Sequence, residues 1–72
     1  MDDKKLKRLR EIYKPGTRVV LITMDDPAAP PVGTQGTVLG VDDIGSVMTK
    51  WDNGSSLSLL YGVDSFSVVE KK

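Results

Sequence analysis

Carboxylates are the side chains of this 72-residue chain with the clearest capacity for chemistry, because they recur in its Gly- and Pro-rich segments. Hard cations such as Ca²⁺ and Mg²⁺ take oxygen ligands, so aspartates converging at one sheet edge would make a metal site. Their spacing does not match the EF-hand loop, and each stands where Asp favours turns and caps. We therefore expect them to shape turns, and we predict no metal site. The aspartates concerned are Asp25, Asp26, Asp42, Asp43, Asp52 and Asp64.

Nucleophilic catalysis is a second chemistry to consider, because Ser55, Ser56 and Ser58 lie close together. A serine nucleophile needs an adjacent base, and the chain contains no His and no Cys. The segment 33–36, GTQG, contains a GxxG pattern, but strand-like residues flank it on both sides. We predict a turn at this segment, no catalytic residue, no cofactor and no enzymatic activity.

A partner-binding groove is a third possibility, because Trp51 and Tyr61 stand in segments rich in turn residues. Some peptide-binding domains use an aromatic-lined groove to hold Pro-rich ligands. A domain of this size has little apolar bulk to spare, so we favour core positions for Trp51 and Phe66. The candidate contacts for a partner are Trp51, Tyr61, Asp25, Asp26 and Pro27.

The formal net charge of zero hides a cationic N-terminal segment joined to an acidic body. Residues 1–14 carry six basic and three acidic groups, a net +3, and residues 15–70 carry two basic and seven acidic groups, a net −5. The basic side chains could contact phosphates, although they could equally form a solvated outer face, and the acidic body would repel a polyanion. The candidate phosphate contacts are Lys4, Lys7, Arg8 and Lys14.

These basic residues belong to a helix that the sequence predicts over residues 2–14. Asp2 or Asp3 is the expected N-cap, and the Pro-Gly pair at residues 15–16 ends the helix. Apolar residues recur at helical spacing and form one stripe, which needs a surface to cover. The stripe consists of Leu6, Leu9, Ile12 and Tyr13.

Residues 17–24 are aliphatic and β-branched on both alternating faces, which predicts a strand covered on both sides. We expect Val19 and Leu21 to face the interior of a small barrel. We expect Val20 and Ile22 to lie under the apolar stripe of the helix.

The next segments alternate between turns and strands. Three prolines stiffen the loop at residues 25–33. A second strand at residues 34–41 contains Gly36 and Gly40, which indicate bulges or sharp bending. A turn follows at residues 42–45, and its final glycine can take a positive φ.

The segment VMTKWDNGSSLSLL (47–60) predicts a hairpin whose register depends on the length of its loop. A two-residue loop would scatter the apolar residues over both faces. A three-residue loop, residues 52–54, with a left-handed glycine gathers them on one face, and burial favours this register. Its strand pairs are Trp51–Ser55, Thr49–Leu57 and Val47–Leu59.

The C-terminal part of the chain predicts one more turn and one more strand. Residues 61–64 are typical of a short 3₁₀ turn, and residues 65–69, with Glu70, alternate Phe66 and Val68 in a last strand. One helix and about five closely spaced strands indicate a mainly β fold, a small barrel or sandwich. The predicted organisation is a cationic helix packed on the barrel at residues 1–14, the barrel at residues 15–70 and a tail at residues 71–72.

The segments GTRVVLITMDDP, PPVGTQGTV and WDNGSSLSL together resemble a family of bacterial and phage proteins called domain of unknown function 4314. The resemblance covers roughly residues 15–69 and leaves the N-terminal helix outside the shared motifs. It implies a five-stranded SH3-like barrel, carrying here one N-terminal amphipathic α-helix, and membership of a family often found in mobile elements. A Pro usually stands where this chain has Tyr61. The resemblance implies no established activity.

The expected function is a non-enzymatic interaction module that binds a protein partner through the helix, the Pro-rich loop or an open sheet edge. The alternative is an accessory nucleic-acid-binding protein of a mobile element that uses the basic helix. Without an apolar segment of membrane-spanning length or a signal sequence, we expect a cytoplasmic protein with no membrane partner. The sequence leaves the oligomeric state open.

Overall fold

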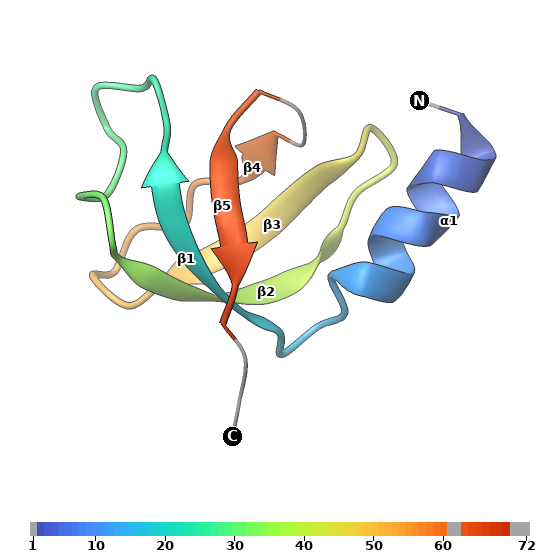
Figure 1. Cartoon of the computed structure of the whole chain (residues 1–72), viewed down its shortest axis with the longest axis horizontal. Coiled ribbons are helices and arrows are strands. Elements are labelled where there is room, and N and C mark those ends of the chain that lie inside the picture. The colour runs from blue at the N-terminus through green and yellow to red at the C-terminus, as the bar shows by residue number, and fades with distance from the viewer. Residues whose placement is uncertain (1, 61–62, 70–72) are drawn as a thin grey trace.

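The structure, a computed structural model, describes residues 2–60 and 63–69. One helix precedes five strands, and the strands form a single antiparallel sheet (Figure 1). The mainly β fold with one N-terminal helix is therefore confirmed. The elements are α1 (Asp3–Ile12), β1 (Arg18–Thr23), β2 (Gln35–Val41), β3 (Ser46–Trp51), β4 (Leu59–Leu60) and β5 (Ser65–Val68).

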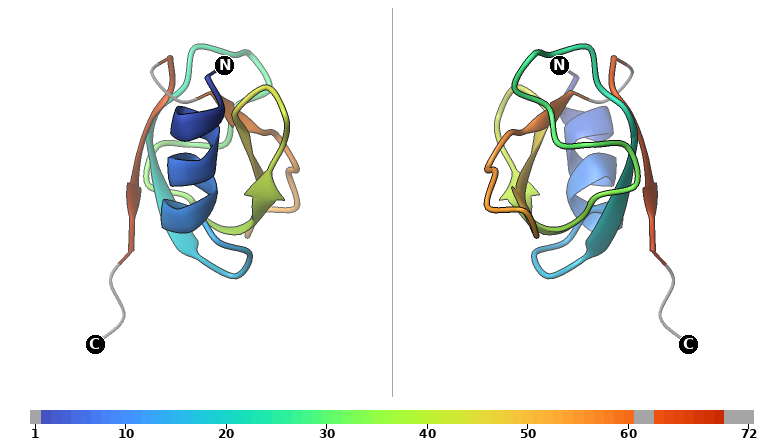
Figure 2. Two further views of the ribbon diagram at one scale, coloured as in Figure 1. Left: turned by 90° about the vertical axis from the view of Figure 1, so that its right-hand side faces the viewer. Right: turned by 90° about the vertical axis from the view of Figure 1, so that its left-hand side faces the viewer.

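The strand order in the sheet is β4-β3-β2-β1-β5. Strands β1, β2 and β3 each pair with the strand that follows, and β5 returns to pair with β1. The sheet curls so that β1 and β5 lie on one side, β3 and β4 lie on the other, and α1 crosses the open end between them (Figure 2). Strands β4 and β5 share no ladder in the described part of the chain, so the expected closure into a barrel is not confirmed.

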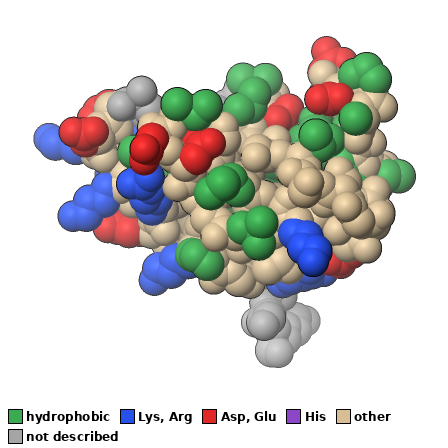
Figure 3. All heavy atoms as spheres, turned by 180° about the vertical axis from the view of Figure 1, so that it is seen from behind, with side chains coloured by type: hydrophobic (Ala, Val, Ile, Leu, Met, Phe, Trp, Pro, Cys, Tyr) green, Lys and Arg blue, Asp and Glu red, His purple; other side chains and the backbone are tan. Residues whose placement is uncertain are grey.

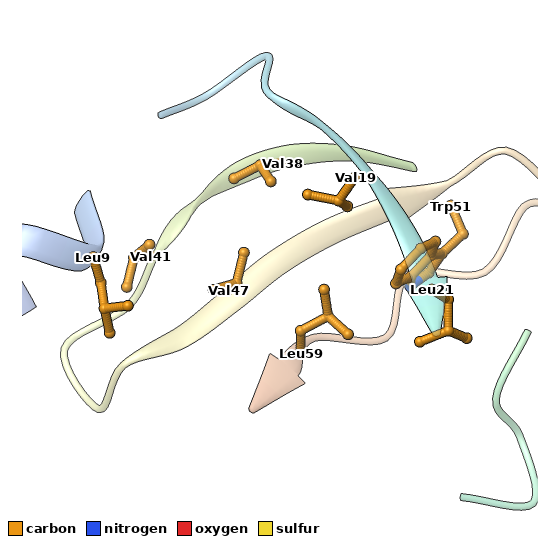
Figure 4. Packing of buried hydrophobic residues seen from close by; sticks show 8 residues of the cluster. All are labelled: Leu9, Val19, Leu21, Val38, Val41, Val47, Trp51 and Leu59. Carbon is orange, nitrogen blue, oxygen red and sulfur yellow. The ribbon is translucent and has the colours of Figure 1, made fainter. Parts of the chain in front are cut away.

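The core fills the space that the curled sheet encloses. Val19 and Leu21 are 0% and 1% exposed, which confirms the predicted inward face of β1. Figure 4 shows Leu9 beside Val41 at the helix end of the core and Leu21 beside Trp51 at the opposite end. The buried apolar residues are Leu9, Val19, Leu21, Val38, Val41, Val47, Trp51 and Leu59.

The chain turns after β3 at residues 52–54 as predicted, although strand β4 begins only at Leu59. The Trp51 amide donates to the Ser55 carbonyl at 2.8 Å, and the Gly54 amide donates to the Trp51 carbonyl at 3.0 Å. Gly54 has a φ of 93°, a conformation that glycine adopts without steric penalty. Val47 pairs with Leu59, as predicted. Because Val47, Trp51 and Leu59 are all buried, this register does place the apolar residues on the core face.

The two glycines of β2 serve different purposes. The register with β3 shifts between Val38 and Gly40, which confirms a bulge at Gly40. No shift occurs at Gly36, which pairs regularly with Trp51. A Cβ at Gly36 would lie 2.8 Å from both Thr49 Cγ2 and Trp51 Cε3. Glycine is required there because the indole ring packs directly on the backbone, and the prediction of a second bulge is wrong.

Helix α1 begins at one of its two predicted caps. The Asp2 carboxylate accepts a hydrogen bond from the Lys4 amide at 3.0 Å. The helix ends at Ile12, two residues before the predicted end, and Tyr13 is its C-cap. No helix in residues 2–60 and 63–69 has the length and apolar character needed to cross a membrane.

The helix packs against the end of β2 and not over β1 as expected. Leu9 is only 4% exposed and lies beside the last residue of β2 (Figure 4). Ile22 is 45% exposed, so the expectation that the helix covers Val20 and Ile22 is wrong. The connection explains the difference: the Gly16 amide donates to the Val38 carbonyl at 2.8 Å and turns the helix back toward β2.

Candidate functional site

The pairing of the first and last strands brings two distant segments together at one end of the sheet. Thr23, at the end of β1, pairs with Ser65, at the start of β5. The chain leaving β1 at Met24 therefore lies near the chain entering β5 at Asp64, where the ends of both strands lie close together in Figure 1. The register of β1 with β5 therefore places residues from both halves of the chain close together.

A hollow of about 240 Å³ lies at this junction, and we call it the acidic hollow. Aliphatic residues and three aspartates line it, and none of the lining residues that the structure describes is Lys or Arg. Leu60 and Val63 are 46% and 77% exposed, so apolar surface here is open to solvent. The lining residues are Met24, Asp25, Asp26, Leu57, Ser58, Leu60, Val63 and Asp64.

The carboxylates of the acidic hollow differ in whether they form hydrogen bonds with the backbone. Asp26 Oδ1 accepts from the Ala28 amide at 2.8 Å, and Asp64 Oδ2 accepts from the Leu60 amide at 2.9 Å. These contacts confirm the predicted turn-forming role of both residues. Asp25 makes no hydrogen bond or ion pair with any described residue. No group of three or more carboxylates in the described ranges could hold a metal ion.

The turn at residues 42–45 follows the prediction closely. Asp42 Oδ1 accepts from the Ile44 amide at 3.2 Å and from the Ser46 amide at 2.8 Å. Gly45 has a φ of 85°. Asp43 at the tip of this turn pairs with Arg10 of the helix at 2.9 Å, so the turn also anchors α1.

Asp52 forms an ion pair that joins two parts of the sheet. Arg18 Nη1 on β1 donates to Asp52 Oδ1 at 2.9 Å, and Arg18 Nη1 and Nη2 also donate to Thr37 and Gln35. The hydrogen bonds from Arg18, aided by its charge, lower the pKa of Asp52, although partial desolvation opposes this effect. The same pairing raises the pKa of Arg18. This carboxylate is therefore held by Arg18 as part of the fold.

The aromatic candidates do not form a surface groove together. Trp51 is 1% exposed, and its indole N–H donates to the Leu57 carbonyl at 3.0 Å, so the interpretation of Trp51 as a core residue is confirmed. Phe66 packs partly buried against Tyr13, with ring centroids 5.3 Å apart. Pro27 is exposed but does not line the acidic hollow. Tyr61, with the predicted turn at its position, lies outside the described residues.

The basic candidates are exposed, but they do not form one helical arc. Lys4, Lys7 and Arg8 lie on α1, whereas Lys14 follows the helix end. None of the four forms an ion pair with a residue that the structure describes. Helical spacing places Glu11 between Lys7 and Arg8 on the same face. Figure 3 shows blue and red side chains interleaved at the helix end of the molecule.

Sequence reasoning identified part of the acidic hollow and missed the rest. It named Asp25 and Asp26 as partner contacts and Asp64 as a turn residue, but it did not group them with Leu57 or Val63. The signal that could have grouped them is the pairing of β1 with β5, which places residues 24–26 beside residues 63–64. That pairing depends on the whole sheet and is not visible in any local pattern.

Together, the curled five-stranded sheet and the docked N-terminal helix define a small, mainly β domain. Residues 2–69 match the family described as Domain of unknown function (DUF4314), and the chain belongs to this family. The match includes the helix, so the expectation that the family motifs exclude it is corrected. No curated protein and no solved structure gives a significant match to the chain.

Proposed function

We propose that this protein is a non-enzymatic interaction module that binds a protein partner at the acidic hollow. The hollow itself carries the proposal, because it combines solvent-exposed aliphatic side chains with carboxylates that have no cationic neighbour in its lining. Covering such aliphatic surface contributes roughly 25 cal/mol per Å². The volume of about 240 Å³ is below the usual range for small-molecule sites and fits side chains of a partner better.

The β1–β2 loop supports a contact role for this end of the molecule. It supplies Met24, Asp25 and Asp26 to the hollow. Three prolines restrict its backbone, and Pro30 is buried. A wall that is already restricted loses little conformational freedom when a partner binds, so less of the binding free energy is spent on ordering it.

Two further parts of the proposal rest on composition. Without His or Cys, the chain offers none of the usual pairs of nucleophile and base, so we assign it no reaction. A cysteine-free chain has no need of an oxidising compartment, and we propose the cytoplasm as the place where it acts.

Selection from a random peptide library on the full chain tests the proposal. Val63 at the hollow is 77% exposed and Val32 outside it is 74% exposed, so Val63→Lys and Val32→Lys make a matched pair of variants. We expect peptides enriched on the natural chain to bind Val32→Lys and to lose most of their binding to Val63→Lys. If no peptide is enriched, or if both variants bind equally, the hollow is not the binding site.

The second candidate function is contact with nucleic-acid phosphates through Lys4, Lys7, Arg8 and Lys14. The observation that favours it is the exposure of all four side chains without an ion pair among the described residues. Glu11 on the same helix face and the net −5 of the body oppose it. Binding to a short duplex at low salt that is lost in Lys7→Glu/Arg8→Glu would favour this function over the protein partner.

A further inference from the structure

The acidic hollow also indicates what kind of partner segment it accepts, and this inference rests on the proposed function. We propose that it binds a peptide segment in which an arginine lies next to an aliphatic residue. The two properties of the peptide correspond to the two kinds of side chain that line the hollow.

The cationic part of the partner follows from the charge of the hollow. Asp25, Asp26 and Asp64 bring three carboxylates to the hollow, and no basic residue occurs in the described part of its lining. Neither Arg10 nor Arg18 is among the described lining residues, and each pairs with a carboxylate elsewhere, Arg10 with Asp43 and Arg18 with Asp52. A ligand cation therefore meets uncompensated negative charge, which speeds encounter and selects against acidic segments.

The aliphatic part of the partner follows from the apolar surface of the hollow. Met24 and Leu57 pack against the core on their inner side, while Leu60 and Val63 are largely open to solvent. A ligand side chain that covers Leu60 and Val63 removes apolar surface from water on both partners. The carboxylates then fix the orientation of the peptide, because only one of its side chains can pair with them.

Arginine fits the carboxylates better than lysine does. Its planar guanidinium presents several donors and can bind two carboxylate oxygens at once, and its stem can lie along apolar surface. Asp26 and Asp64 each use one oxygen to accept a backbone amide, and Asp25 makes no such contact. Acceptor capacity for a guanidinium therefore remains on all three side chains.

The test uses the ¹⁵N-labelled full chain titrated with capped peptides and followed by amide chemical shifts. The first peptide is Gly-Ala-Leu-Arg-Leu-Ala-Gly, and its matched controls replace Arg by Gln or by Glu. We expect the Arg peptide to shift amides of residues 24–26 and 57–64. Replacing Arg by Gln should weaken binding roughly three- to tenfold, and Glu should abolish it.

The matched protein variants are Asp25→Asn/Asp26→Asn and Glu11→Gln. Asparagine keeps the side-chain oxygen that accepts from the Ala28 amide, so the loop fold should persist, as the spectrum of the free variant will show. Glu11 lies on α1, which lines no part of the hollow. The double variant should bind the Arg peptide as weakly as the natural chain binds the Gln peptide, and Glu11→Gln should bind normally.

Three results would contradict the preference for an arginine-containing peptide. None of them would contradict the proposed function, which the library selection tests separately. Equal binding of the Arg and Gln peptides would show that charge does not select the partner. Shifts confined to other surfaces would place the peptide elsewhere. The third result is that library peptides lose their binding to Val63→Lys and yet contain no basic residue. In that case the hollow binds proteins, but it does not select arginine.

Discussion

The guanidinium of Arg18 and the carboxylate of Asp52 form an ion pair that joins a strand to the loop after β3. Arg18 lies on β1, and Asp52 begins the loop after β3, so the pair crosses β2. Both side chains are partly exposed, which limits the contribution of the pair to stability. The hydrogen bonds to Thr37 and Gln35 of β2 hold the guanidinium in place and make the geometry specific.

The lowered pKa of Asp52 predicts how stability depends on pH. A carboxylate whose folded-state pKa lies below its ordinary value of 3.8 stabilises the fold above that value. The contribution is lost as the pH falls through the lower, folded-state pKa. The raised pKa of Arg18 acts only at strongly alkaline pH and does not affect this range. Denaturant unfolding of the natural chain and of Asp52→Asn should therefore differ at neutral pH, and the difference should shrink below about pH 4.

Asp25→Asn is the control for this measurement. It removes a carboxylate that forms no hydrogen bond or ion pair with a described residue, so the stability of this variant should follow that of the natural chain across the pH range. Curves for Asp52→Asn and the natural chain that stay parallel down to pH 2 would show that the ion pair does not carry the pH dependence.

At the scale of the elements, local sequence patterns predicted the features that depend only on residues close together in sequence. The alternation of Val19 and Leu21, the loop at residues 52–54 and the Asp42 turn were all predicted from types and spacing, and all are confirmed. The position of the helix was not predictable in this way. It is set by the turn at Gly16, which directs α1 toward β2 and leaves Ile22 open.

The acidic hollow was only half predictable for the same reason. Asp25 and Asp26 stand out in the sequence because two adjacent aspartates precede a Pro-rich loop. Leu57 and Val63 do not stand out: Val63 comes near the loop through the pairing of β1 with β5, whereas Leu57 belongs to the segment before β4 at the other edge of the curled sheet. Contacts between residues far apart in sequence need the sheet register, which short motifs do not specify.

The docking of α1 depends on one buried side chain, and this can be measured. Leu9 is 4% exposed in the core, whereas Ile12 on the same helix is 49% exposed. Leu9→Ala should lower the free energy of unfolding by about 2–5 kcal/mol, because it leaves a cavity beside Val41. Ile12→Ala should change it by less than about 1 kcal/mol. Similar losses in urea unfolding for both variants would mean that the helix does not dock through Leu9.

At the scale of the whole molecule, opposite ends offer different surfaces. Figure 3 shows carboxylates beside apolar side chains at the end formed by the β1–β2 loop, and mixed basic and acidic side chains at the helix end. The helix covers one open end of the curled sheet, and the acidic hollow lies where β1 and β4 end and β5 begins. Because these surfaces do not overlap, the hollow can be altered without removing the helix from the core.

The outer edge of β5 decides whether the curled sheet closes. The Val69 amide donates to the Arg18 carbonyl at 2.8 Å, and Val20 pairs with Ser67. In an antiparallel ladder, hydrogen-bonded residues alternate, so the amides of Ser67 and Val69 point to β1 and those of Phe66 and Val68 point outward. If the edge is open, Phe66 and Val68 should exchange their amide hydrogens much faster than Ser67 and Val69.

Hydrogen exchange followed by NMR measures this alternation residue by residue, and the central pair β2–β3 supplies the reference for full protection. Strong protection of all four amides of residues 66–69 would require acceptors on a further strand, either β4 of the same molecule or a second copy. Repeating the measurement over a range of protein concentrations separates the two, since only pairing between molecules weakens on dilution. A concentration-independent, uniformly protected β5 would establish a closed barrel, and alternating protection would establish a sheet whose edge is free to pair with a partner strand.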